Sequence, residues 1–209
     1  LVNFAQPGPS SLVLNRVAAS AGASEIQGRL TANGQVFLLN PNGVLFGKTA
    51  QVDVGGIVAS TLNLSDANFL AGRYAFINGG GAGSVVNQGA LKAAEGGYIA
   101  LLAPEVRNEG VIAARLGTAA LAAGDQVTLD FSGDRLVRLA VNQAALKALT
   151  ENRHLIQADG GTVILAARSA GDLASTVVNN VGLIQAASVS KRNGVIHLDG
   201  GERGAVAVS

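Results

Sequence analysis

The sequence predicts an all-β protein, a single-stranded parallel β-helix whose coils are about 20 residues long. Turn motifs recur at that spacing, and the apolar runs between them are short and rich in β-forming residues. Hydrophobic residues make up 48% of the 209 residues, but aromatic residues make up only 4%. An interior filled mainly by Val, Ile, Leu and Ala favours a stack of many thin, similar layers.

Glycine and asparagine mark the repeat. Gly97 recurs as Gly117, and Asn87 recurs as Asn108, each about one coil length further along the chain. Later in the chain, one pair of glycines is separated by about two coil lengths. A propeller blade needs about twice the single period, and the Leu-x-x-Leu-x-Leu pattern of leucine-rich repeats is absent. A solenoid in which each strand pairs with the coils on either side therefore fits best.

Two of the predicted strands, residues 36–39 and 44–46, meet at the turn Asn40-Pro41-Asn42-Gly43. Both runs are too short and too rich in β-formers to be helices. Proline restricts φ to a narrow range, asparagine can bond nearby backbone, and glycine tolerates a positive φ. The chain is expected to change direction sharply here.

Asparagines in Asn-Gly or Asn-x-Gly sequences are expected to make the other corners, as residues tolerant of the left-handed conformation. Stacked asparagines can also hydrogen-bond to each other along the solenoid. The predicted corner residues are Asn33, Asn42, Asn78, Asn87, Asn108, Asn180 and Asn193.

Residues 137–155 break the period. Val141, Ala145, Leu146 and Leu149 recur at helical spacing, Asn142 can cap a first turn, and neither Gly nor Pro interrupts. The sequence therefore predicts one short α-helix near 142–152, packed outside the solenoid against residues 163–165.

Composition excludes several classes of partner. The chain has 15 basic and 14 acidic residues and no basic cluster interleaved with aromatics, so no nucleic-acid partner is predicted. No polybasic membrane patch is present either. The longest uncharged stretch, roughly 74–91, is interrupted by glycine and asparagine, so no transmembrane segment is predicted. Cysteine is absent, which rules out disulfides and thiolate metal sites.

A carbohydrate-active enzyme is the natural rival, because parallel β-helices also occur among polysaccharide lyases and hydrolases. Such an enzyme needs converging carboxylates. The candidates are Asp125, Asp130 and Asp134, with Glu105 and Glu109 one coil earlier, but spacings of five and four do not place the aspartates on one side of a strand. No catalytic residue is predicted, and the chain is not expected to be an enzyme.

The remaining candidate sites also lack a supporting pattern. His154 and His197 are far apart and belong to no metal-ligand spacing, so no metal site is predicted. The glycine-rich residues 79–83 are not followed by the Lys-Ser or Lys-Thr of a phosphate loop and are expected to form a flexible corner. No cofactor is predicted. Asn63 begins the only glycosylation sequon, which carries little weight by itself.

The chain resembles the N-terminal secretion domain of the filamentous haemagglutinin family, also called the haemagglutination activity domain. The resemblance runs through nearly the whole chain and thins after about Ala187. The segments that carry it are residues 1–17, 40–43, 52–61, 66–72, 85–89, 97–104, 113–117 and 122–125.

The resemblance implies a right-handed β-helix that addresses a large exported protein to an outer-membrane β-barrel transporter with periplasmic domains. The family's Asn-Pro-Asn-Gly motif matches Asn40, Pro41, Asn42 and Gly43, so a role in recognition or folding carries over to these residues. It carries over less directly to Asn15 and Arg16. The domain would seed β-helix folding at the cell surface.

The expected organisation is one secretion domain over residues 1–209, the interior of a longer product. An N-terminal capping part and signal peptide would precede it, and a passenger would follow it. The protein is expected to be secreted, or held at the surface of a Gram-negative bacterium, after crossing the periplasm. Two alternatives stay open: the enzyme, and an adhesive module that binds host glycans or cell-surface proteins.

Overall fold

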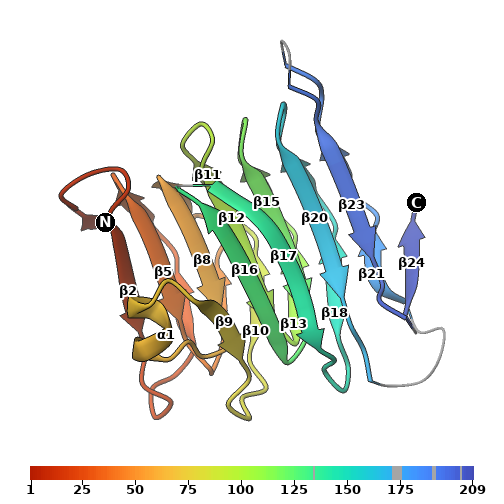
Figure 1. Ribbon diagram of the computed structural model, residues 1–209, viewed down its shortest axis with the longest axis horizontal. Helices are drawn as coiled ribbons and strands as arrows, with labels where there is room; N and C mark the ends of the chain where they lie inside the picture. The colour runs from red at the N-terminus through yellow and green to blue at the C-terminus, as the bar shows by residue number, and fades with distance from the viewer. Residues whose placement is uncertain (134, 171–175, 190–191, 203) are drawn as a thin grey trace.

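The chain winds into a β-helix with three parallel sheets as its faces (Figure 1). The structure is a computed structural model and describes residues 1–133, 135–170, 176–189, 192–202 and 204–209. Each coil contributes one strand to each sheet, so that hydrogen bonds run between successive coils. The predicted all-β, parallel β-helix class is confirmed.

Each parallel sheet has seven strands, which follow one another in space in the order of the coils. Sheet A contains β1 (Val2–Phe4), β4 (Arg29–Ala32), β7 (Gln51–Val54), β11 (Ala90–Ala93), β14 (Val111–Ala113), β19 (Leu155–Gln157) and β22 (Leu183–Gln185). Sheet B contains β2 (Leu12–Arg16), β5 (Gln35–Leu39), β8 (Gly56–Ser60), β12 (Tyr98–Ala103), β15 (Thr118–Ala123), β20 (Thr162–Ala167) and β23 (Val195–Asp199). Sheet C contains β3 (Ser24–Ile26), β6 (Val44–Phe46), β10 (Ser84–Asn87), β13 (Glu105–Asn108), β18 (Leu149–Asn152), β21 (Thr176–Asn180) and β24 (Ala205–Val208).

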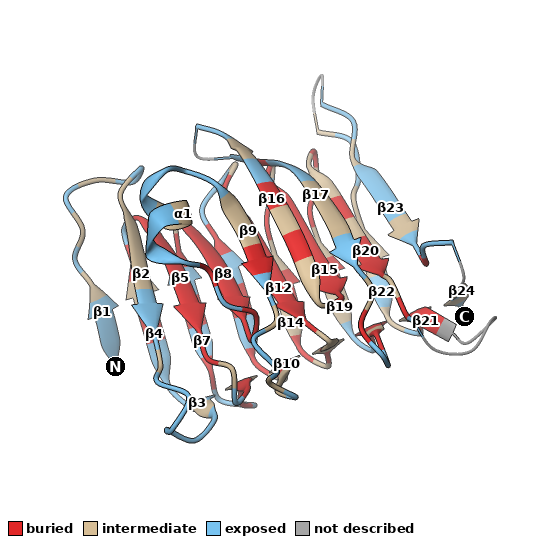
Figure 2. Ribbon diagram, turned by 60° about the horizontal axis from the view of Figure 1, so that its bottom comes forward, coloured by how far each residue is buried: buried red, intermediate tan, exposed pale blue. Residues whose placement is uncertain are grey.

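Two insertions leave the solenoid and build a fourth sheet (Figure 2). Sheet D is antiparallel and contains β9 (Tyr74–Ile77), β16 (Gln126–Ser132) and β17 (Arg135–Gln143). The first insertion also carries the helix α1 (Asp66–Leu70), which Ser65 caps.

The strand register explains the irregular spacing in the sequence. Ile99 lies opposite Ala119, a single period further along, as the repeat predicts. Ile57 lies opposite Ile99, a double step along the chain, because α1 and β9 intervene. Ala119 lies opposite Val163, again a double step, because β16 and β17 intervene. The double steps are therefore one coil plus one insertion.

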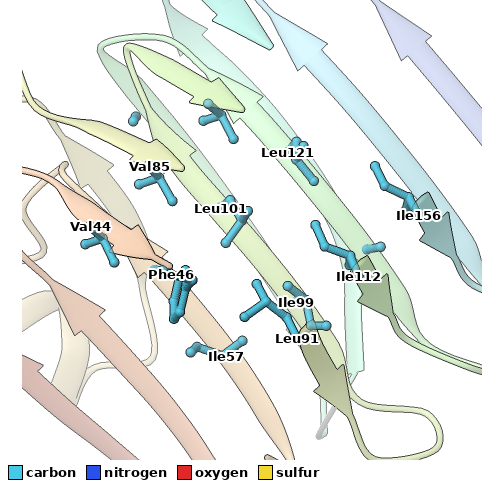
Figure 3. Packing of buried hydrophobic residues seen from close by; sticks show 14 of the residues in the cluster. Val44, Phe46, Ile57, Val85, Leu91, Ile99, Leu101, Ile112, Leu121 and Ile156 are labelled. Carbon is cyan, nitrogen blue, oxygen red and sulfur yellow. The ribbon is translucent and has the colours of Figure 1, made fainter. Parts of the chain in front are cut away.

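The interior of the solenoid is almost entirely aliphatic. Columns of Val, Ile, Leu and Ala from the three sheets pack against each other, and Phe46 is the one aromatic residue among the buried members of this inner core (Figure 3). Side chains of this size fit the narrow space that three short parallel strands enclose. The predicted aliphatic filling is confirmed.

A second core lies outside the solenoid, between the outer face of sheet B and the elements α1 and sheet D (Figure 2). Its centre is Phe37, which is fully buried and stacks edge-on against Tyr74 and Phe69 at centroid distances of 5.4 and 6.0 Å. The chain's aromatic residues are concentrated here: Phe37, Phe69, Tyr74, Phe76, Tyr98 and Phe131.

The predicted helix near 142–152 is wrong. Its first residues belong to strand β17 and its last to β18. The apolar spacing arises because Val141 packs in the outer core and Ala145 in the inner core, while Leu146 is 73% exposed. Asn142 caps nothing and accepts a hydrogen bond from the Thr128 hydroxyl at 2.6 Å. Strand pairing, which the local pattern could not reveal, overrides helical periodicity here.

Asparagines form a buried ladder along one corner of the solenoid. Each side-chain Nδ2 donates to the next Oδ1, from Asn87 to Asn108 at 2.8 Å, to Asn152 at 2.8 Å and to Asn180 at 2.7 Å. The stacking expected from the sequence is confirmed for Asn87, Asn108 and Asn180, whereas Asn152 is a member of the ladder that the sequence does not predict. The left-handed conformation expected of the corner asparagines is wrong, since among described residues only Leu116 and certain glycines have a positive φ.

No helix in the described residues is long and apolar enough to span a membrane.

Candidate functional site

The Asn-Pro-Asn-Gly turn (residues 40–43) links β5 of sheet B to β6 of sheet C. The Gly43 N–H donates to the Asn40 carbonyl at 3.1 Å, which closes the turn. Gly43 has a φ of +123°, a conformation that residues with a side chain rarely adopt. The local sequence thus produces the sharp corner that was expected.

Asn40 is fully buried and uses its whole side chain. Its Nδ2 donates to the Gly22 carbonyl at 3.0 Å and to the Ser24 hydroxyl at 2.9 Å. Its Oδ1 accepts from the backbone N–H of Asn42 at 2.9 Å. Because a buried amide must be satisfied in this way, Asn40 fixes the turn against the preceding coil.

Asn42 is the exposed side chain of the turn. Its Nδ2 donates to the Ala19 carbonyl at 3.0 Å and makes a second, shorter bond to the Ala21 carbonyl. These bonds hold the loop of residues 17–23, which belongs to the preceding coil, against the turn. Since they are exposed to water, they contribute less to stability than the buried bonds of Asn40.

The following coil closes on the other side of the turn. A Cβ added at Gly81 would lie 2.7 Å from the Pro41 carbonyl oxygen, and one at Gly83 would lie 2.6 Å from that oxygen and from the Gly43 nitrogen. Glycines are required at these two positions because two backbones touch, so residues 81–83 form a packed contact, while Gly79 and Gly80 have open space around them. The turn is clamped between loops of two neighbouring coils.

Asn15 and Arg16 lie at the end of β2, beside Leu38 and Leu39 and therefore next to the turn. The Arg16 side chain extends the other way: its Nη1 forms an ion pair with the Asp66 carboxylate at 2.9 Å, and Nη2 donates to the Leu64 carbonyl. Arg16 thus tethers α1 to the first coil. Asn15 is exposed, at the N-terminal end of the inner column that contains Leu38.

Among the candidate carboxylates that the structure describes, no two share a hydrogen-bonding or ion-pair partner. The Asp125 carboxylate accepts from Asn78 at 2.7 Å, and Asp130 lies opposite Arg138 in sheet D. Glu105 pairs with Arg107 at 2.7 Å. Asp125 and Glu105 are thus each held by a local partner.

Glu109 accepts from Gln88 at 3.0 Å, while Asp134 lies outside the described residues. His154 and His197 are both exposed and lie in different coils. Over the described part of the chain, no group of three or more His, Asp or Glu residues could hold a metal ion.

The Asp159 carboxylate has a pKa below its ordinary value. The Gln157 side chain, the Ala187 backbone N–H and the Gln185 side chain donate to it, and Arg115 lies nearby, so its pKa is lowered from 3.8. It sits at the corner between sheets A and B, well away from the turn.

Sequence reasoning missed two features that hold coils of the solenoid together. Asn152 completes the asparagine ladder, but an insertion displaces it from the period and no glycine follows it. The Tyr98 hydroxyl donates to Gln35 Oε1 at 2.7 Å, across a long separation in sequence. The first could have been found by removing the insertion from the repeat, whereas no local pattern marks the second.

Comparison with known proteins gives matches over nearly the whole chain. The family model for the TPS secretion domain matches residues 1–208. The heme/hemopexin-binding protein of Haemophilus influenzae (strain ATCC 51907 / DSM 11121 / KW20 / Rd) is 33% identical over 206 residues, covering 94% of this chain and 22% of that protein. A second heme/hemopexin-binding protein of Haemophilus influenzae is 43% identical over 75 residues, which cover 36% of this chain and 8% of the relative.

A solved structure shares the fold. The crystal structure of the HMW1 secretion domain from Haemophilus influenzae superposes with a TM-score of 0.81 at 32% identity, covering 94% of this chain and 51% of that one. The chain therefore spans about a fifth of the first of these relatives and about half of the solved secretion domain.

Proposed function

Because the chain belongs to the TPS secretion domain family, whose members are the secretion domains of exported two-partner secretion substrates, we propose that it directs a longer protein to a cognate outer-membrane transporter. The transporter's periplasmic domains would recognise this segment before it folds. The protein would cross the periplasm of a Gram-negative bacterium and be released or displayed at the cell surface. We assign contacts with host glycans or cell-surface proteins to the remainder of the longer protein.

The observation that carries the proposal is the burial of the Asn-Pro-Asn-Gly turn between two coils. Asn40 and Gly43 are buried in the folded domain, yet they would be accessible in an unfolded chain. Folding on the far side of the membrane would therefore hide them from the transporter. Each coil that stacks would make the return of the chain less favourable, because its apolar side is buried only against a neighbour.

The roles proposed for the recognition residues differ accordingly. Asn40 and Gly43 hold the turn, and Pro41 restricts its backbone. Asn42 is the motif side chain that can be changed with least effect on stability. Asn15 and Arg16 adjoin the same corner, but the ion pair of Arg16 with Asp66 gives that residue a separate structural task.

The test measures export of a passenger fused to this domain in cells that do or do not express the transporter, together with the stability of each purified variant. Asn42→Ala should lower export several-fold while costing less than about 1 kcal/mol of unfolding free energy. Asn142→Ala, at an exposed position of sheet D, is the matched control and should leave export unchanged.

Two results would contradict the proposal in different ways. Export that does not depend on the transporter would exclude the secretion function itself. Export that falls only in proportion to stability across Asn40→Ala, Asn42→Ala and Gly43→Ala would show that the turn is structural and not read by the transporter.

A further inference from the structure

A groove of about 490 Å³ runs along the outer face of sheet B where sheet D ends. One wall is the start of β17, with Arg135 and Val137, and the other carries Arg192. Thr162 and Ile164 of β20 lie on its floor. The volume falls within the usual range of ligand-binding sites. Figure 2 shows β17 lying over β15, with β20 beside it and β23 beyond β20.

The threonine on the floor of the groove has an equivalent in the preceding coil, where it holds strand β17 by a hydrogen bond. Thr118 is buried, and its hydroxyl donates to the Leu136 carbonyl of β17 at 2.7 Å. Thr162 occupies the same column of sheet B, directly opposite Thr118. Its hydroxyl makes no side-chain hydrogen bond to any described residue. Thr162 is thus placed to donate to a strand that lies beside β17.

The apolar column under sheet D also continues into the groove. Ala120 is covered in the outer core, and Ile164 lies opposite it in the next coil. Ile164 is only half-buried and packs at the margin of that core. An additional strand would complete its burial.

The hydrogen-bond pattern of sheet D shows which groups of β17 are available. Ile77 of β9 exchanges both backbone bonds with Asn63, at 2.8 and 2.9 Å, so it faces away from β16. Because antiparallel strands alternate the direction of their bonding groups, Val127 and Leu129 of β16 bond to β9.

It follows that Thr128 and Asp130 bond to the other neighbour, β17, opposite Ala140 and Arg138. The backbone groups of the intervening Leu139 therefore point to the open side of β17. Sheet order confirms that β17 is an edge strand. Such an edge can accept a further strand.

The charge at the groove indicates what kind of strand could bind beside β17. Arg135 and Arg192 are exposed and form no ion pair among the described residues, and no Asp or Glu among these residues lines the groove. A second copy of β17 would bring its own Arg135 and Arg138 to the same edge, which like-charge repulsion opposes. An acidic strand is complementary to both arginines.

We infer that this groove binds an extended acidic segment of a partner protein, which adds to β17 as a fourth strand of sheet D. Main-chain bonds to the β17 edge hold the segment, and Thr162 donates to its backbone. Arg135 and Arg192 pair with its carboxylates.

The experiment titrates the purified domain with a fluorescent nine-residue peptide of alternating glutamate and valine and follows anisotropy. The double variant Arg135→Glu/Arg192→Glu should weaken binding by at least about tenfold. Val137→Asp, at a position that is 59% exposed, should weaken it in the same direction. Arg29→Glu, on sheet A outside the groove, reverses a comparable exposed charge and should change the affinity by less than about twofold.

Circular dichroism confirms that each variant is folded before titration. Three outcomes would overturn the inference. The first is absence of binding at millimolar peptide. The second is an equal loss of affinity in Arg29→Glu, which would indicate general charge attraction. The third is binding of polygalacturonate, but not of the peptide, in a manner that requires Arg135 and Arg192, because the ligand would then be an anionic polysaccharide.

Discussion

Replacing Asn108 tests whether the asparagine ladder stabilises the solenoid. Asn108 is fully buried in the middle of the ladder. It accepts from Asn87 at 2.8 Å and donates to Asn152 at 2.8 Å and to the Leu155 carbonyl at 3.2 Å. Asn108→Ala removes all three bonds and leaves the Asn152 Oδ1 without the donor that it has in the wild type.

The expected cost follows from these contacts. Two good side-chain bonds contribute about 1 kcal/mol each, and an orphaned buried acceptor adds about 1–3 kcal/mol. The free energy of unfolding should therefore fall by about 3–5 kcal/mol. With a urea dependence of about 3 kcal/mol per molar, the midpoint should drop by roughly 1–2 M.

Urea denaturation followed by circular dichroism measures this shift. Asn142→Ala is the matched control, since Asn142 is exposed and accepts one bond from Thr128, and it should cost less than about 1 kcal/mol. Equal costs for the two variants would refute the reasoning. The buried bonds of the ladder would then contribute no more to the free energy of unfolding than the exposed bond of Asn142 does.

Two further predictions concern the corners of the solenoid. Gly117→Ala should cost about 3 kcal/mol or more, because the new Cβ would collide with the Gly97 carbonyl oxygen, and backbone cannot move aside as a side chain can. Thermal unfolding should show Gly28→Ala, which has no atom within 4 Å of the added Cβ, close to wild type, and a stable Gly117→Ala would disprove the close stacking. Because the pKa of Asp159 is lowered by folding, the unfolded chain binds more protons than the folded chain as the pH falls. The ionised Asp159 therefore stabilises the folded state fully above the usual pKa of 3.8, and this stabilisation is lost as the pH falls through the folded-state pKa. The difference in Tm between wild type and Asp159→Asn should therefore shrink on acidification from about pH 6 to below about 4, and a difference independent of pH would contradict this assignment.

The sequence alone determined the repeat and hence the class of fold. Glycines such as Gly97 and Gly117 recur because two backbones meet at each corner, so a contact between coils leaves a local trace at a regular interval. The same holds for the Asn-Pro-Asn-Gly turn, in which the conformational restriction resides in the residues themselves. These features could be predicted because their physical cause acts within a few residues or repeats with the period.

The tertiary structure decided everything that depends on insertions. Residues 141–149 carry apolar side chains at helical spacing, yet Val141 and Ala145 pack in different cores on opposite sides of one sheet. The pairing of β16 with β9 joins two insertions that lie far apart in the sequence, and no local sequence pattern in either segment predicts which strand it pairs with. Long-range pairing is selected by the apolar surface it buries, and that surface exists only once the coils have stacked.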